Sequence, residues 1–255
     1  MFGPIPFCWR MAVHVALMQP YLFPYAGYFG LVHAADVFVL FDNVQYHRRG
    51  WMHRNRVHHP TSGWRYVGVP VVKAPRDAVI RDIRLKPGWQ DRLLDDIIAA
   101  YRGQAQEADA MLEWLTRVLD VDTSWLHEVN RHTLEATAKH MGLPCRWESA
   151  TDLMITRDPD LPLWDWARQA CGRLDGTAYL NLPGGEGIYP SEPFVDRGLG
   201  LGFIQPRLEP YDRGAGDWEA GLSILDVIAH CGAKGAGAYA AQYGVLWTVA
   251  QPGGD

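Results

Sequence analysis

Short apolar runs alternate with helical periodicity at the start of the chain. Residues 12–18 and 37–41 are continuous apolar runs, and the second is rich in β-branched and aromatic side chains, as buried parallel strands are. Between them, residues 27–35 carry apolar side chains at helical spacing. A strand, a helix and a second strand within about thirty residues form a βαβ unit, whose crossover we expect to be right-handed.

The same alternation continues after one long helical interruption. From residue 89 to about 142 the apolar positions keep a helical period. We predict further strands at 64–72, 82–85, 145–153, 177–185 and 201–208, and helices at 163–176 and 222–243, the last with a glycine-rich interruption. The predicted fold class is α/β, a Rossmann-like and mostly parallel sheet with a helical insertion. Its parts are a disordered leader at 1–10, the βαβ part at 11–88, the insertion or subdomain at 89–143, and a C-terminal part at 144–250.

Bulk composition narrows the class of partner. Hydrophobic residues make up 48% of the 255 residues and charged residues 21%, which is typical of a soluble globular domain. The net charge of −5 argues against broad binding to nucleic acid or to an anionic membrane, which requires a basic surface. No apolar run approaches transmembrane length and the first ten residues do not resemble a signal peptide, so we expect a cytoplasmic protein without a membrane span.

The segment that enters the first predicted helix has an unusual sequence. Tyr25-Ala26-Gly27-Tyr28 has the spacing and the setting of the His-x-Gly-His signature of the nucleotidyltransferase superfamily, so the βαβ start resembles that superfamily. Tyrosines replace both histidines, and a neutral phenol stabilises a transferring phosphate less well than a histidine does. The resemblance therefore supports the architecture more than adenylyl transfer. The competing interpretation is that Tyr25 and Tyr28 are packing aromatics.

Donor groups are dense just after the second predicted strand. Residues 42–59 hold Asp42, Asn55, several histidines and several arginines. One interpretation is a loop that binds a phosphate or carboxylate through its arginines, with His47 or His53 as general base. The other is a solvated loop with incidental histidines. The histidine spacing is a weak metal signal, and we expect no metal site.

Two further features are less specific. Residues 179–189 place Gly184 and Gly185 after a strand, where a backbone can approach a ligand closely, although a generic turn fits equally well. The four cysteines are far apart and lack C-x-x-C spacing, so neither zinc nor a disulfide framework is expected. Cys171 and Cys231 lie in predicted helices, where we favour buried structural thiols over a nucleophile paired with a distant histidine.

Several blocks of the chain together resemble a known family. The runs are M-Q-P-Y-L-F-P-Y-A-G-Y-F, D-N-V-Q-Y, R-R-G-W, H-R-N-R-V, Y-L-N-L-P-G-G and L-S-I-L-D-V. They are similar to the WbqC-like protein family from about residue 12 to 245. That family occurs in O-antigen gene clusters, and its members have been proposed to be glycine or aminoacyl transferases. The chain also resembles the carrier-protein-dependent condensing enzymes of lincosamide antibiotic pathways.

The resemblance implies an ATP-independent, amide-forming acyl transferase of antibiotic or surface-polysaccharide biosynthesis. An acyl or peptidyl carrier protein would present an aminoacyl thioester on its phosphopantetheine arm, with no bound cofactor, and an amino sugar would accept the acyl group. Residue type and position, together with the resemblance, point to His47, His53 and Asp42 as catalytic residues. The chain departs from the family here, because family members often carry Asn where His53 stands and an acidic residue where Asn43 stands. The implied substrate-binding residues are Gln19, Tyr25, Tyr28, Arg54, Asn55, Lys73, Asn181, Gly184 and Gly185. Residues 19–28 and 42–55 should then line one pocket at one end of the sheet.

Three alternatives of other classes stay open. One is a nucleotidyltransferase-like enzyme that binds a nucleotide or nucleotide sugar. Another is a transferase with an acyl-enzyme intermediate on Cys171 or Cys231. The last is a non-catalytic module that binds a carrier protein or a sugar.

Overall fold

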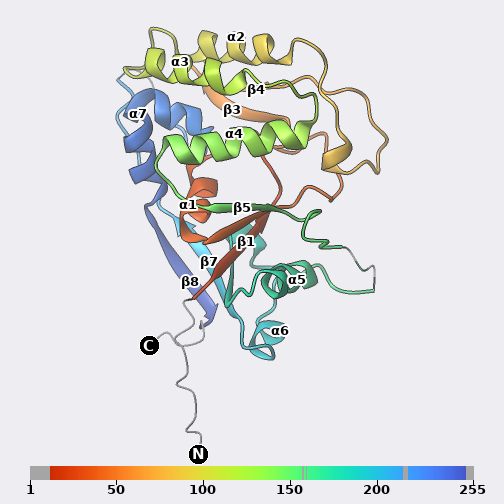
Figure 1. Cartoon of the computed structure of the whole chain (residues 1–255). Coiled ribbons are helices and arrows are strands. Elements are labelled where there is room, and N and C mark those ends of the chain that lie inside the picture. The colour runs from red at the N-terminus through yellow and green to blue at the C-terminus, as the bar shows by residue number, and fades with distance from the viewer. Residues whose placement is uncertain (1–11, 157, 159, 215–217, 251–255) are drawn as a thin grey trace, which may run out of the picture.

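The computed structural model describes residues 12–156, 158, 160–214 and 218–250 of the chain (Figure 1). The predicted leader lies outside these residues. The main sheet has the strand order β5-β2-β1-β6-β7-β8. Its strands are β1 His14–Met18, β2 Val37–Leu40, β5 Arg146–Ser149, β6 Ala178–Asn181, β7 Gly200–Pro206 and β8 Tyr243–Val249. The helices are α1 Ala26–Ala34, α2 Trp89–Tyr101, α3 Ala108–Leu119, α4 Leu126–His140, α5 Asp165–Arg173, α6 Glu192–Val195 and α7 Ile224–Ala240, with 3-10 turns η1 Ile80–Asp82 and η2 Pro183–Gly185.

The strand pairings confirm the predicted mostly parallel α/β sheet. Strands β5, β2, β1, β6 and β7 are parallel, and β8 runs antiparallel to β7. Strand β1 pairs with β2 on one side, with Met18 opposite Leu40, and with β6 on the other, with Ala16 opposite Leu180. The chain thus changes direction across the sheet next to β1. Ligands of open α/β sheets bind outside the carboxyl ends of strands near such a switch point.

Alternate residues of the strands enter two separate hydrophobic cores. Phe38 and Leu40 pack in the core that also holds side chains of α1, α4 and α7. Val37 and Val39 pack in the second core, with side chains of α5 and α6. Figure 1 shows these two groups of helices on opposite sides of the sheet. Because both faces of the sheet are covered, its central strands are continuous apolar runs in the sequence.

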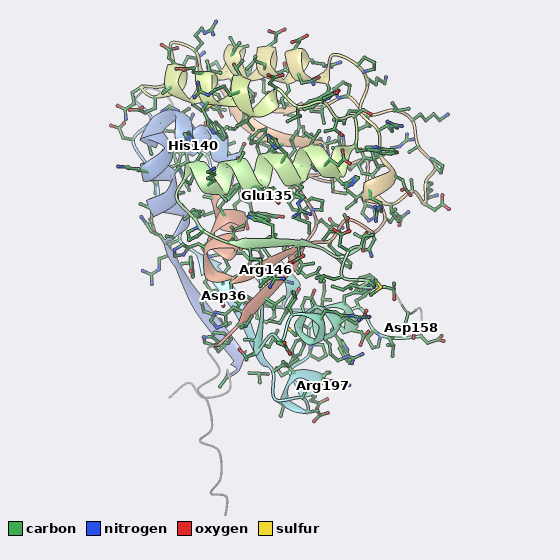
Figure 2. The ribbon with its side chains drawn as sticks, in the orientation of Figure 1. Asp36, Glu135, His140, Arg146, Asp158 and Arg197 are labelled. Atoms are coloured by element: carbon green, nitrogen blue, oxygen red, sulfur yellow. The ribbon has the colours of Figure 1, made fainter. Side chains whose placement is uncertain are left out.

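The predicted helical segment contains α2, α3 and α4. Leu93, Leu115 and Leu134, one from each helix, belong to the same hydrophobic core as α1 and α7. The segment therefore extends the core of the sheet. Asp36, Arg146 and Arg197, which Figure 2 labels, are exposed on the outside of this frame. None of the helices in the described residues is long and apolar enough to cross a membrane.

Several predictions of local secondary structure were wrong. Residues 54–59, read as a loop, form β3 (Arg54–His59), which pairs with β4 (Gly63–Gly68) in a separate antiparallel hairpin. The predicted strand at 82–85 is η1 followed by isolated bridges. Strand β8 was not expected. It is an edge strand that pairs only with β7, and each of its residues is partly or fully exposed, so it lacks the buried apolar run of a central strand.

The turn between β1 and α1 is held by buried side-chain amides from distant elements. Asn130 of α4 donates to Pro20 O at 2.8 Å. Asn55 of β3 donates at 3.0 Å to each of the carbonyls of Leu22 and Phe23. Because prolines remove backbone donors from this turn, its carbonyl groups depend on donors from elsewhere in the chain.

The same turn has a strained residue and a close contact. Phe23 adopts a left-handed backbone (φ 40°), and Ser223 Oγ donates to its carbonyl at 2.8 Å. At Gly27 a Cβ atom would lie 2.4 Å from the Tyr25 ring and 2.9 Å from the Pro206 ring. The glycine therefore lets the first turn of α1 approach both rings. The turn and helix α1 are thus fixed against β3, α4 and α7 at once.

Replacing Asn130 with alanine tests the contribution of these amides to stability. Asn130 is 0% exposed and donates to Pro20 O and Met52 O. Asn130→Ala should lower the free energy of unfolding by about 1–3 kcal/mol, because two buried carbonyls lose their donor. Urea denaturation measures the change. The exposed Gln104→Ala is the control and should stay within about 0.5 kcal/mol of the wild type. Equal stability of the two variants would contradict this account of the turn.

Candidate functional site

The loop after β2 and the segment after β4 enclose a cavity of about 1130 Å³, which we call the cationic cavity. Its positively charged and imidazole lining residues are His47, Arg48, Arg49, His53, Lys73, Arg76 and Lys86. The described residues that line it include no carboxylate. Such a lining attracts a phosphate or a carboxylate group. Three residues predicted from the sequence, His47, His53 and Lys73, share this cavity.

His53, which lines the cationic cavity, has a strongly lowered pKa. Burial, together with the nearby Arg54 guanidinium, lowers the pKa of His53 from 6.5 to about 4. Its Nδ1 atom lies 2.8 Å from the Tyr46 hydroxyl. Burial raises the pKa of Tyr46 to about 12, so the phenol stays protonated near neutral pH. His53 is therefore a neutral imidazole, oriented by a neutral phenol, among positive charges.

Backbone pairing shapes the wall of this cavity. Tyr46 N donates to Ala78 O at 2.8 Å and Ile80 N donates to Val44 O at 2.9 Å. Gln45 Nε2 donates to Arg76 O at 2.8 Å, which holds the two loops together at the cavity. The arginines and histidines therefore project from loops that are tied to each other.

A second, smaller cavity of about 200 Å³ lies at the carboxyl ends of β1, β2 and β5, and we call it the edge cavity. Its lining residues are Pro20, Leu40, Asp42, Arg81, His127, Glu128, Arg131, Ser149 and Asp152. Asp42 is 4% exposed and accepts hydrogen bonds from Ser149 Oγ at 2.8 Å and from Thr151 Oγ1 at 3.0 Å. The predicted catalytic residues are thus divided, with Asp42 here and both histidines in the cationic cavity.

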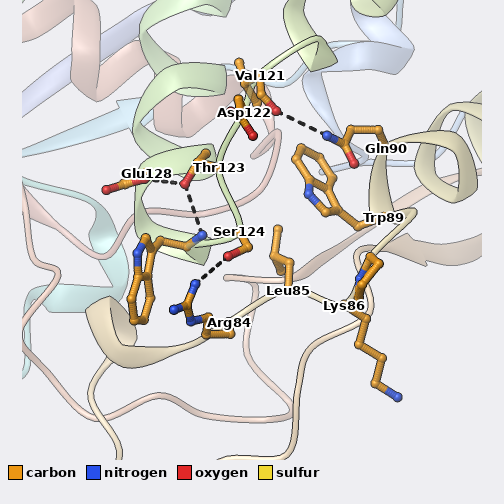
Figure 3. A pocket seen from close by; sticks show the side chains of 12 residues that line it. Arg84, Leu85, Lys86, Trp89, Gln90, Val121, Asp122, Thr123, Ser124 and Glu128 are labelled. Carbon is orange, nitrogen blue, oxygen red and sulfur yellow. Dashed lines mark hydrogen bonds between the residues drawn. The ribbon is translucent and has the colours of Figure 1, made fainter.

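A third space of about 640 Å³ lies next to both cavities (Figure 3). It shares Lys86 with the cationic cavity and Glu128 with the edge cavity. Figure 3 shows Arg84 donating to Ser124 Oγ, at 2.7 Å. The Arg84 guanidinium also stacks on the Trp125 ring, 3.9 Å from its centroid. These interactions hold the segment before α4 against the segment after η1, and so position the first turn of α4.

Two predicted binding residues next to His53 face elsewhere. Arg54 donates to Arg49 O at 2.8 Å and its guanidinium stacks on the Tyr66 ring at 4.1 Å. Asn55 is 6% exposed, and its amide nitrogen is occupied by the turn after β1. Successive strand residues point to opposite faces, so Arg54 and Asn55 lie on different sides of the hairpin.

The predicted binding residues of the first turn, Gln19, Tyr25 and Tyr28, do not line the three cavities. Tyr28 is 0% exposed, and its hydroxyl donates to Gln19 O at 2.9 Å. Its ring packs against Phe38, with centroids 5.3 Å apart. The structure therefore places Tyr28 in the core and not at a ligand surface. Tyr25 is half-buried next to Gly27, and neither it nor Gln19 lines the three cavities described above.

The glycine turn after β6 lies across the switch point from these cavities. Asn181 is 5% exposed and binds the Tyr179 hydroxyl and Leu182 N through its amide group. Gly185 is buried in η2, whereas Gly184 is exposed. None of these residues lines the three cavities.

Burial makes the helix cysteines poor nucleophiles. It raises the pKa of Cys171 to about 12 and also raises the pKa of Cys231. Cys231 is the less buried of the two thiols. The raised pKa values of both thiols weigh against a cysteine nucleophile. Among the residues that the structure describes, no three His, Cys, Asp or Glu side chains are grouped so that they could hold a metal ion.

Comparison of the sequence with known protein families gives one match that covers most of the chain. The model of the WbqC-like protein family matches residues 19–237. The chain belongs to the WbqC-like protein family. The match includes the turn after β1 and the residues that line all three cavities. The chain is also 27% identical over 229 residues to the uncharacterized protein Rv1507c of Mycobacterium tuberculosis (strain ATCC 25618 / H37Rv), covering 86% of this chain and 94% of that protein. No solved structure matches the chain.

Several residues that line the cationic cavity and the edge cavity of this WbqC-like protein were not predicted from the sequence. Tyr46 stands beside the predicted histidines, but its contact with His53 depends on how the loop folds. His127 and Arg131 lie in the segment that was assigned only a helical role. In the sequence, His127 and Arg131 are recognisable only as part of the polar face near the start of α4. Such a face is typical of a solvated helix surface, so it does not by itself indicate a cavity.

The lowered pKa of His53 predicts a specific dependence of stability on pH. Between pH 6.5 and about 4 the unfolded chain binds a proton at this residue and the folded chain does not. Stability contributed by neutral His53 is therefore complete above pH 6.5 and is lost as the pH falls toward 4. Urea denaturation across this range should show a steeper loss for the wild type than for His53→Gln. Parallel curves for the two proteins would contradict the lowered pKa.

Proposed function

We propose that this WbqC-like protein forms an amide bond by moving an aminoacyl group from a carrier-protein thioester to an amino sugar, in antibiotic or surface-polysaccharide biosynthesis. The observation that supports this proposal best is a neutral His53 in a cavity lined by five cationic side chains. Membership of the WbqC-like family loosely suggests a transferase. The proposal adds the donor, the acceptor and the role of each group.

The cations suit the phosphate of the donor. A phosphopantetheine arm carries its thioester at one end and a phosphodiester at the other, where it joins the carrier protein. Lys73 and Arg76 lie on the segment after β4, and Arg48 lies on the facing loop, so a phosphate between them would meet positive charge from two sides. A carrier protein with an acidic surface would complement the same region.

His53 acts as the general base of the proposed reaction. In the tautomer that carries the proton on Nδ1, His53 donates to the Tyr46 oxygen at 2.8 Å and keeps its Nε2 lone pair free. The sugar amine attacks the thioester carbonyl and loses a proton to Nε2. The tetrahedral intermediate collapses as the carbon–sulfur bond breaks. The imidazolium returns its proton to the departing thiolate, leaving an amide and a free thiol.

The surroundings in the cationic cavity affect the protonation of both groups in that proton transfer, the sugar amine and His53. Positive charge disfavours an ammonium group, so the amino sugar is present as the neutral, nucleophilic amine. Without substrate, burial and the nearby Arg54 guanidinium keep the pKa of His53 at about 4, which makes it a weak base. A phosphate bound beside His53 adds a negative charge that favours the imidazolium and raises the pKa of His53 toward the working pH, so donor binding activates the base. A thioester is already activated, so the reaction requires no ATP.

A reconstituted reaction tests the proposal directly. The protein is mixed, without ATP, with aminoacyl-loaded carrier proteins and a panel of amino sugars, and the products are followed by mass spectrometry. An amide with the mass of the acyl group plus the sugar is expected. His53→Gln should lower the rate at least about 100-fold, because it removes the base. Tyr46→Phe should lower it less, because it removes only the group that orients the base.

His59→Gln is the matched control, since His59 lies at the far end of β3 and its Nδ1 atom is 3.1 Å from Ser62 Oγ. This variant should keep the wild-type rate. A mass increment on the protein itself would point to a covalent intermediate instead of direct transfer. If His53→Gln retained the full rate, the role assigned to His53 would be wrong.

A further inference from the structure

We propose that the edge cavity binds a small zwitterion of the α-amino acid class, at a site separate from the cationic cavity. The lining combines both signs of charge within about 200 Å³. Its cations are Arg81 and Arg131, and its carboxylates are Asp42, Glu128 and Asp152. A single anion or a single cation would meet like charge on one side of this space, whereas a molecule carrying both charges satisfies both sides.

The position of the edge cavity is that of a ligand site in an open α/β sheet. Pro20 and Asp42 each lie two residues beyond their strand, and Ser149 ends β5. The strands β1, β2 and β5 are adjacent and parallel, so their carboxyl ends meet at one edge. Helix α4 supplies His127 on the other side of the cavity. Ligands of such sheets bind outside these strand ends.

Two donor groups without hydrogen-bond partners lie at one end of the edge cavity, and this end would hold the carboxylate of the ligand. The guanidinium of Arg81 makes no hydrogen bond or ion pair with another residue in the described part of the chain. The Nδ1 atom of His127 is buried and has no hydrogen-bond partner there, although the Arg81 backbone lies close to the ring. Burial lowers the pKa of His127, so this nitrogen belongs to a neutral ring. Arg81 can hold a carboxylate in a bidentate manner, with the protonated Nδ1 tautomer of His127 as a further donor.

The first turn of α4 also favours an anion at this end of the edge cavity. Leu126 N donates to Ile83 O at 2.9 Å, but the backbone N–H groups of His127 and Glu128 have no acceptor among the described residues. Free N–H groups in the first turn of a helix favour an anion. Glu128 itself is bound to the Thr123 hydroxyl, in the third space, so its carboxylate is directed there.

The opposite end suits an ammonium group. Asp42 accepts from Ser149 and from two donors of Thr151, which hold the carboxylate in place. A carboxylate offers about four lone-pair sites, so Asp42 can accept one further hydrogen bond. The side chain of Asp152 has no hydrogen-bond or ion-pair partner in the described part of the chain. Asp42 is thus a fixed acceptor, and Asp152 is an exposed second one.

This ligand differs from the donor of the proposed function. In a thioester the carboxyl group of the amino acid is bonded to sulfur and carries no negative charge, so it would leave Arg81 unpaired. The edge cavity therefore fits a free zwitterion, as a second substrate or as an effector. This inference does not depend on acyl transfer.

Isothermal titration calorimetry of the full-length protein tests the site without any donor. The probes are the standard amino acids and β-alanine, and the single-charge analogues are acetate and methylamine. At least one zwitterion should bind with one-site stoichiometry, and both analogues should bind at least about tenfold more weakly, because each lacks one charge-assisted contact. Arg81→Gln and Asp152→Asn should each weaken binding of that zwitterion by about tenfold or more.

Two matched variants serve as controls. Lys73→Gln removes a cation of the cationic cavity, and Asp122→Asn removes an exposed carboxylate of the third space. Both should bind the zwitterion as the wild type does. If no zwitterion bound, or if Arg81→Gln and Asp152→Asn bound it unchanged, the proposed site would be wrong. Binding by a protein that transfers no acyl group would support the site and contradict the proposed function, so the two failures are distinguishable.

Discussion

The structure depends on donors from distant elements that satisfy the carbonyl groups of the turn after β1. Asn55, Asn130 and Ser223 come from β3, α4 and the start of α7, and each donates to this one turn. A buried carbonyl without a donor is costly, so the turn forms only when these three elements are in place. The same hydrogen bonds fix the hairpin and α4 relative to the sheet. Both cavities are built from these attached elements, so the turn supports them without lining the cationic cavity.

The two cavities differ in the charge that they present. The cationic cavity holds positive charge alone around a neutral imidazole, and it favours an anionic ligand and a deprotonated amine. The edge cavity balances guanidinium groups against carboxylates at the end of the parallel strands. A chain of net charge −5 can therefore carry two local fields of different character. Loops attached to a rigid sheet make this separation possible, because neighbouring loops can present different side chains without changing the core.

Much of the frame was predictable because it depends on local pattern. The apolar runs at β1 and β2 are buried on both faces, and the glycine-rich interruption in α7 appears as a kink at Gly232, whose φ is 68°. The concentration of arginine and histidine after β2 marked the cationic cavity, since binding residues gather on such loops. Hairpin β3–β4 was harder to predict, because its polar residues alternate with buried ones that include Asn55 and His58.

The sequence by itself determined the α/β class, the parallel strands and the segment after β2 in which arginine and histidine concentrate, because periodicity and composition are local properties. Only the tertiary structure decided which polar residues meet. It buries Tyr28 and Asn55, separates Asp42 from His53, and brings His127 to the strand ends. The physical reason is that a polar side chain has the same local signature whether it satisfies a buried carbonyl or faces a cavity. The packing of α4 and the hairpin against the sheet makes that choice.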